Sequence, residues 1–194
     1  MMAPIRTFVA IDISSDVRKA LVNAIHDFRD LKLNDVRWIK PCGIHLTLKF
    51  LGDINPCLVQ PILVGLKQST EGKAAFRLGL STLGVFPNIR NPRTLWVGLQ
   101  GDLEELKALQ SRIERNLQLI DFPKESRPFT PHLTIGRVRN NLTSGQIRTI
   151  DQRLGKTISV GSDYWRIDAV HLIQSNFTPN GTVYRKLGTV LQEL

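Results

Sequence analysis

Two short segments of the sequence place a histidine and a threonine two residues apart. The first, His-Leu-Thr-Leu, occupies positions 45–48, and the second, His-Leu-Thr-Ile, occupies positions 132–135. Both lie in apolar stretches that predict β-strands, where residues two apart point to the same face. Each segment therefore presents an imidazole and a hydroxyl on one face. The 87-residue separation is close to half of the 194 residues and predicts two similar halves.

Paired imidazoles suit phosphoryl chemistry, because histidine exchanges protons near neutral pH. With one histidine on each side of a phosphorus atom, one takes a proton from an attacking water and the other protonates the departing oxygen. In-line displacement at a phosphodiester needs this opposed geometry. The Thr47 and Thr134 hydroxyls can donate hydrogen bonds to the non-bridging oxygens. The spacing is not that of a helical zinc site, so we expect neither a metal nor a cofactor.

Basic and aromatic residues near the two segments are candidate RNA contacts. Lys49 lies four residues after His45, so strict alternation predicts that it shares the histidine's face and contacts phosphate. Phe50 is a candidate for stacking on a base. Arg127 precedes the second segment and is a candidate for lining the approach to it. The remaining histidines, His26 and His171, lack a following threonine, and we interpret them as a solvated and a structural residue.

Strands and helices alternate along the chain, but several strands also occur in adjacent pairs. This order favours an α+β fold with mostly antiparallel strands. Apolar β-rich segments predict strands at 5–13, 37–39, 44–51, 74–85, 93–99, 129–138, 156–160, 164–174 and 182–187. Amphipathic spacing and capping residues predict helices at 15–31, 56–69, 102–117 and 143–154. Pro61 predicts that the second helix starts late or kinks.

These elements suggest two pseudo-symmetric lobes with facing sheets around a central cleft and helices on the outside. We interpret residues 1–194 as a single bilobal domain, and we expect a monomer. Lysine and arginine number 26 against 17 acidic residues, a formal net charge of +9 that favours an anionic partner. No apolar stretch is long enough to span a membrane, and no signal peptide is evident. The only cysteines, Cys42 and Cys57, suggest reduced thiols and a cytoplasmic location.

The match to a known family extends beyond the two histidine segments. The chain resembles the two-histidine phosphoesterase superfamily, in particular the bacterial and archaeal RNA 2′,3′-cyclic phosphodiesterases, historically called 2′-5′ RNA ligases. The resemblance covers nearly the whole chain. It is carried by residues 6–12, 36–38, 45–53, 84–87, 92–93, 95–99 and 129–137, and by Ser175, Gly181, Tyr184 and Leu187.

The resemblance implies a bilobal α+β fold with a basic groove and metal-independent hydrolysis of a terminal RNA 2′,3′-cyclic phosphate to a 2′-phosphomonoester. Reverse 2′-5′ ligation would accompany this hydrolysis. The resemblance also implies His45 as proton donor and His132 as proton acceptor. It further implies Thr47, Thr134 and Arg137 as phosphate ligands. Arg137 lies five residues after His132, so regular alternation places it on the wrong face. A bulge or the strand's end must turn it back, or its role is structural.

Two other classes of function fit the same residues. One is a non-catalytic RNA- or nucleotide-binding module, whose histidines only recognise phosphate and which would release a cyclic nucleotide unaltered. The other keeps the catalysis but changes the substrate to a 2′-5′ oligoadenylate or a small cyclic phosphate. The sequence chemistry does not decide which histidine is the acid, which RNA is the substrate, or whether hydrolysis or ligation dominates.

Overall fold

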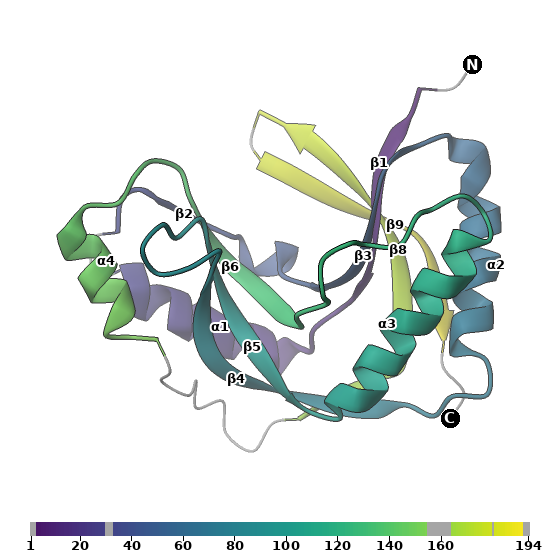
Figure 1. Cartoon of the computed structure of the whole chain (residues 1–194), viewed down its shortest axis with the longest axis horizontal. Helices are drawn as coiled ribbons and strands as arrows, with labels where there is room; N and C mark the ends of the chain where they lie inside the picture. The colour runs from purple at the N-terminus through teal and green to yellow at the C-terminus, as the bar shows by residue number, and fades with distance from the viewer. Residues whose placement is uncertain (1–2, 30–32, 155–163, 180, 192–194) are drawn as a thin grey trace.

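The computed structural model describes residues 3–29, 33–154, 164–179 and 181–191. Figure 1 shows a curled sheet with helices packed around it. The α-helices are α1 (Ser15–Arg29), α2 (Val59–Thr70), α3 (Leu103–Gln118) and α4 (Ser144–Asp151), and the 3₁₀ helices are η1 (Pro41–Gly43) and η2 (Pro56–Leu58). The strands are β1 (Ile5–Ile11), β2 (Val36–Trp38), β3 (Leu46–Ile54), β4 (Phe76–Phe86), β5 (Thr94–Gly101), β6 (His132–Val138), β7 (Trp165–Ile167), β8 (Ala169–Thr178) and β9 (Gly181–Leu191).

The strands of the described residues form one sheet with two halves. Its order is β7-β4-β5-β6-β3-β1-β8-β9, with β2 pairing with β6 as well, and all pairs are antiparallel. The halves meet where β3 pairs with β6 through Leu46 and Leu133. Each histidine segment thus lies at the inner edge of its own half. The predicted α+β class with mostly antiparallel strands and two halves is confirmed.

Local capping explains where several helices begin. The Ser14 hydroxyl accepts a hydrogen bond from the first turn of α1 at 3.3 Å, and the Asn55 side chain caps η2. Thr143 and Gln146 form a reciprocal capping box at the start of α4. Pro61 is the third residue of α2, where its missing N–H would have no partner inside the helix. The predicted late start of this helix is therefore correct.

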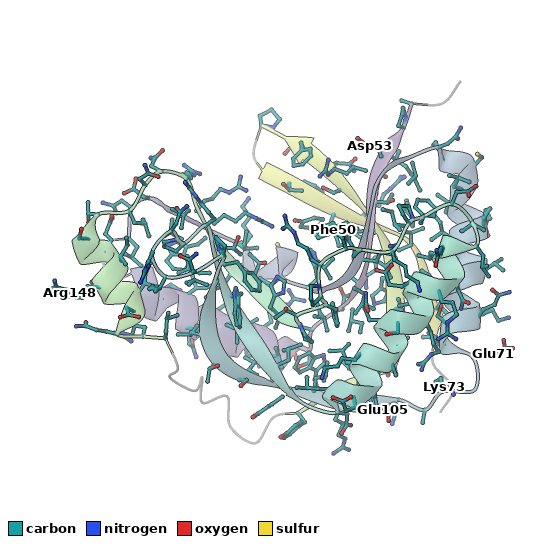
Figure 2. All side chains as sticks on the ribbon, viewed as in Figure 1. Phe50, Asp53, Glu71, Lys73, Glu105 and Arg148 are labelled. Atoms are coloured by element: carbon teal, nitrogen blue, oxygen red, sulfur yellow. The ribbon has the colours of Figure 1, made fainter. Side chains whose placement is uncertain are left out.

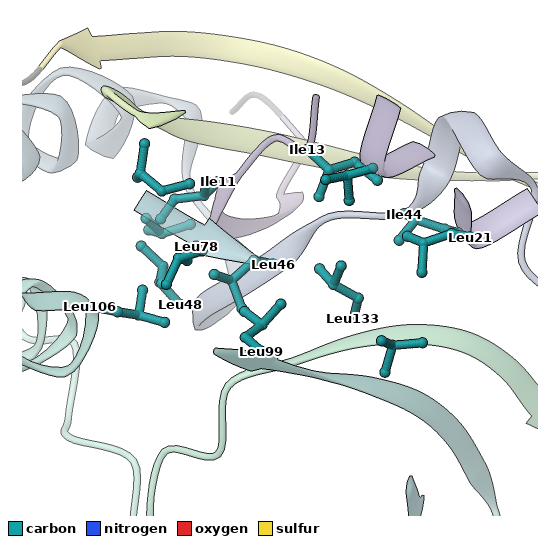
Figure 3. Packing of buried hydrophobic residues seen from close by; sticks show 14 of the residues in the cluster. Ile11, Ile13, Leu21, Ile44, Leu46, Leu48, Leu78, Leu99, Leu106 and Leu133 are labelled. Carbon is teal, nitrogen blue, oxygen red and sulfur yellow. The ribbon is translucent and has the colours of Figure 1, made fainter. Parts of the chain in front are cut away.

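The main core lies on one face of the sheet, beneath all four described α-helices. Leu106, Leu109, Ile113 and Leu117 recur at helical spacing on α3 and are all fully buried. Figure 3 shows Leu46 and Leu48 of β3 beside Leu99, Leu106 and Leu133. The large apolar cluster joins both halves of the sheet, so it holds β3 and β6 together at the seam.

The prediction of one continuous strand over 164–174 is wrong. The chain forms two strands, because β7 pairs with β4 in one half of the sheet and β8 pairs with β1 in the other. Asp168 lies between the two strands, where the chain passes from one half of the sheet to the other. A continuous apolar pattern does not reveal this change of partner strand. The predicted strand at 156–160 and the end of the first predicted helix lie outside the described residues.

Candidate active site

The seam between β3 and β6 brings the two histidine segments side by side. Because the strands are antiparallel and pair Leu46 with Leu133, His45 lies opposite Thr134 and Thr47 lies opposite His132. The two histidines are then diagonal neighbours, and such positions are about 7–8 Å apart. Leu46 and Leu133 point into the core, so the histidines and threonines occupy the other face, called here the histidine face. The structure thus brings these four predicted site residues together.

Each histidine strand contains a β-bulge three residues after its histidine. In β3, Lys49 pairs with Val9 and Thr47 with Ala10, so Leu48 has no partner of its own. In β6, Gly136 pairs with Leu95 and Thr134 with Trp96, which leaves out Ile135. Leu48 and Ile135 are 87 residues apart, like the histidines. A bulge adds one residue to a strand and shifts the alternation of the residues that follow. In β3 this holds as far as Phe50, because a second register shift lies between Phe50 and Gly52.

The bulges decide which residues join the histidines. After the extra residue, Phe50 in β3 and Arg137 in β6 return to the histidine face, and both side chains are exposed. A bulge was one of the options that the position of Arg137 left open, and the structure contains it. Figure 2 shows Phe50 between the two halves of the molecule, as seen in this view.

The prediction that Lys49 contacts RNA is wrong. Its side chain points to the core face, where only 3% of the residue is exposed. The ammonium lies 2.6 Å from a Glu114 carboxylate oxygen and donates a hydrogen bond to the Pro123 carbonyl, also at 2.6 Å. Strict alternation failed here because the bulge at Leu48 changed the face.

Backbone carbonyls orient both imidazoles in the same way. The Nδ1 atom of His132 lies 2.7 Å from the carbonyl oxygen of Thr130. The His45 ring hydrogen-bonds to the backbone of Gly43, the equivalent position in the first half. A carbonyl only accepts, so Nδ1 of His132 must carry the hydrogen. In the neutral ring the Nε2 atom is then free to take a proton.

Aromatic rings pack against each histidine. His45 stacks on Phe8, with ring centroids 4.6 Å apart, and meets the edge of Tyr184 at 5.1 Å. His132 meets Phe86 edge-on at 5.0 Å and Trp96 at 6.2 Å. These contacts remove water from the rings and restrict their rotation.

Burial is the main electrostatic influence on both histidines. It lowers the pKa of His45 to about 4, against opposing effects of the Gly43 hydrogen bond and the Asp12 carboxylate. Burial also lowers the pKa of His132, opposed by the hydrogen bond to Thr130. The Arg137 guanidinium adds to the lowering of both pKa values. One cation therefore lies within electrostatic reach of both imidazoles, as a shared anion-binding site requires.

Phe8 and Tyr184 belong to this site, but reasoning from residue types did not assign them a role. Phe8 is in β1 and Tyr184 in β9, far in sequence from both histidine segments. Phe8 lies on an apolar strand that predicts core, and its only other signal was its place in the segment 6–12 of the family resemblance. The only signal for Tyr184 was its place in the family pattern. The exposed Arg127 lines a shallow cavity of about 230 Å³ with Glu114 and Phe129.

The other histidines and possible ligands do not extend the site. His171 is buried, and its Nδ1 atom lies 2.9 Å from the Thr189 hydroxyl, in keeping with the structural interpretation. Among the described residues, no three histidine, cysteine, aspartate or glutamate side chains gather in a way that could hold a metal ion. Within the same part of the chain, no helix has the length and apolar character needed to cross a membrane.

Comparisons with known proteins agree with this architecture. The chain is 31% identical to the RNA 2′,3′-cyclic phosphodiesterase of Aquifex aeolicus, over 99% of the chain and 97% of that protein. It is 30% identical to the protein of the same name from Methanothermobacter thermautotrophicus, over 93% of the chain and 95% of that protein.

Solved structures share the fold. A structure from Thermus thermophilus superimposes with a TM-score of 0.77 at 26% identity, covering 96% of this chain and 97% of that one. E. coli LigT complexed with 3′-AMP also gives 0.77, at 21% identity, covering 98% and 99%. The family model described as the 2′-5′ RNA ligase superfamily matches residues 17–177. The chain therefore belongs to the 2′-5′ RNA ligase superfamily.

Proposed function

We propose that the protein is an RNA 2′,3′-cyclic phosphodiesterase that works without a metal or another cofactor. The observation that carries the proposal is the pairing of β3 with β6, which sets two oriented imidazoles diagonally across one seam with Arg137 in electrostatic reach of both. The names of its relatives from Aquifex aeolicus and Methanothermobacter thermautotrophicus support the choice of substrate.

The mechanism follows from the positions of the polar groups. The threonines at positions 47 and 134 donate hydrogen bonds to the non-bridging oxygens, and Arg137 offsets their charge. Nε2 of His132 takes a proton from water as its oxygen bonds to phosphorus. The bond from phosphorus to the 3′-oxygen breaks, and His45 gives that oxygen a proton. The products are a 2′-phosphomonoester and a free 3′-hydroxyl. A 5′-hydroxyl of a second RNA in place of water would form a 2′-5′ linkage.

The low pKa of His45 makes its donor role depend on the substrate. At neutral pH the free protein holds this imidazole neutral, because burial disfavours its charged form. A phosphate anion beside the ring favours the charged form and raises the pKa. The substrate therefore brings about the protonation that His45 needs in order to act as an acid.

NMR titration tests this coupling. In the free protein we expect the His45 ring protons to titrate near pH 4. Saturating inorganic phosphate moves the midpoint upward, and Tyr184→Ala also raises it by admitting water to the ring. Assignment uses the resonance lost in His45→Gln. A midpoint near 6.5 in the free protein, or one that phosphate leaves in place, contradicts the proposed coupling.

The same shift affects stability. The unfolded chain takes up the His45 proton near pH 6.5 but the folded chain only near pH 4. The free energy of unfolding therefore falls as the pH drops through that window. In His45→Gln this part of the pH dependence is absent.

Two further residues complete the proposed contacts to RNA, and we propose that the enzyme meets its RNA substrate in the cytoplasm. Phe50 is 60% exposed on the histidine face, with its ring centroid 6.1 Å from that of Phe8, and we assign it to stacking on the terminal base. Arg127 lies in the segment that leads into β6, and we assign it to the incoming backbone.

The decisive experiment supplies an oligoribonucleotide that ends in a 2′,3′-cyclic phosphate. We expect conversion to the 2′-phosphomonoester, identified by mass and by resistance of the product to an enzyme specific for 3′-phosphates. Full activity persists in excess EDTA. Recovery of the cyclic end unaltered after long incubation identifies a binding module instead, and loss of turnover in EDTA contradicts the metal-free mechanism. Turnover confined to 2′-5′ oligoadenylate would show that this compound, and not an RNA 2′,3′-cyclic phosphate, is the substrate.

A further inference from the structure

The hairpin of β8 and β9 carries aromatic residues on the histidine face beyond the catalytic groups. Ala10 of β1 pairs with His171, so His171, Ile173, Ser175 and Phe177 follow one another on that face of β8. Across the hairpin Ser175 pairs with Tyr184. Figure 1 shows the outer part of this hairpin projecting beyond β1, toward the side of β2 and β6.

Phe177 is an exposed ring with a cation beside it. It is 74% exposed, one of the most exposed large apolar side chains among the described residues. The Arg6 guanidinium lies over the ring, 5.8 Å from its centroid. In β1 Arg6 precedes Phe8 by two residues, so both point to the histidine face. The proposed catalytic reaction uses neither Arg6 nor Phe177. An exposed aromatic paired with an arginine is the combination that binds single-stranded nucleic acid.

The aromatic residues form a path that begins at His45. Phe8 contacts His45 and lies 5.6 Å from Tyr184, while Phe50 lies beside Phe8. The Arg6–Phe177 pair continues the same face toward the hairpin tip. We call Arg6, Phe177 and Tyr184 the hairpin patch.

Positive charge accompanies this path. Arg37 of β2 pairs with Arg137 of β6, and both lie within electrostatic reach of the Tyr184 hydroxyl. Arg6 adds a third cation at the far end. Asp53 lies opposite Arg6 on the neighbouring strand, and its carboxylate would repel a phosphate. The positively charged surface therefore stops at Arg6. The short extent of this positive charge suits only a few nucleotides.

We propose that the hairpin patch binds the one or two nucleotides that precede the cyclic phosphate end of a single-stranded RNA. In this model, which rests on the proposed function, Phe177 stacks on a base and Arg6 contacts the adjacent phosphate. Continuity with the histidines and the matching charge select RNA as the occupant. The enzyme would then favour an RNA end over a free cyclic nucleotide.

The test compares two substrates that share one reacting end. One is cytidine 2′,3′-cyclic phosphate, and the other is a trinucleotide that ends in the same group. We expect kcat/KM for the trinucleotide to exceed that for the mononucleotide by about tenfold, the contribution of one stacked base. Phe177→Ala removes most of this advantage and changes mononucleotide hydrolysis less than about twofold. Leu119→Ala, another exposed apolar residue but at the end of α3, is the matched control and retains the advantage.

Salt dependence tests the role of Arg6. Each phosphate contact of a single strand adds about 0.7 to the slope of log affinity against log salt. Arg6→Gln lowers the slope for log KM of the trinucleotide by about this amount and leaves the mononucleotide slope unchanged.

Each failure has a separate meaning. If neither substrate is hydrolysed, the proposed function is wrong. If both are hydrolysed at equal efficiency, or if Phe177→Ala affects them equally, only the hairpin patch is wrong. A wild-type dimer in sedimentation that Phe177→Ala converts to a monomer would identify the patch as a contact between copies of the chain and overturn its assignment to RNA.

Discussion

Replacing either histidine with glutamine lowers the turnover of an RNA 2′,3′-cyclic phosphate by about 10²- to 10⁴-fold, the usual contribution of general acid or base catalysis. Glutamine keeps a donor near the carbonyl of Gly43 or Thr130 but cannot carry a proton to or from the reacting oxygens. The measurement is single-turnover hydrolysis of a cyclic-phosphate oligonucleotide. Urea unfolding of His45→Gln and His132→Gln shows whether each variant remains folded.

A substrate with a better leaving group separates the two roles. A nucleoside p-nitrophenyl phosphodiester releases a phenolate that needs no proton. The variant that lacks the acid, His45→Gln, therefore regains most of its activity on the aryl ester. The variant that lacks the base, His132→Gln, stays impaired on both substrates. The opposite pattern would exchange the two roles, and equal activity of either variant with the wild type on the cyclic phosphate would end the two-histidine mechanism.

Lys49→Met lowers the free energy of unfolding by about 3–5 kcal/mol, because it leaves the Glu114 carboxylate buried without its cation. The two side chains are only 2% and 8% exposed, and the carboxylate also accepts hydrogen bonds from Gln110 and from the Glu125 backbone. The measurement is urea unfolding at neutral pH. The double variant Lys49→Met with Glu114→Leu recovers much of the loss, since two apolar side chains no longer bury an unpaired charge.

Lys107→Met is the matched control for this prediction. Lys107 and Glu104 form a 2.7 Å ion pair on the same helix, α3, but both side chains are more than half exposed. Its loss costs less than about 1 kcal/mol. A similar cost for Lys49→Met would show that the buried pair does not hold α3 to β3.

The buried network of Lys49, Glu114 and Gln110 also contacts β3 on its core face, opposite the histidine face. Beside the bulge, the Gln110 side chain donates a hydrogen bond to the Leu48 carbonyl at 3.4 Å. In the second half the equivalent carbonyl of Ile135 accepts from the Ile39 backbone at 2.9 Å. Both bulges are thus stabilised by groups outside their own strand pair. A folded Lys49→Met therefore has a second expected defect, a misplaced Phe50.

The sequence alone determined the repeated histidine segments, the helical faces and the α+β class. These features depend on residue type and local spacing, as the burial of the apolar face of α3 illustrates. The placement of Arg137 required a bulge that the sequence could only name as one option. The predictions that succeeded, those of the histidine segments and the helical faces, depend on residues that lie close together along the chain.

The tertiary structure alone decided which side chains surround the histidines. Strand pairing with β1 and β5 created the bulges, which moved Lys49 into the core and brought Phe50 to the histidine face. It also placed Phe8 and Tyr184 against His45 from distant strands. Alternation along one strand has a period of two, and only the partner strand determines where that period is interrupted.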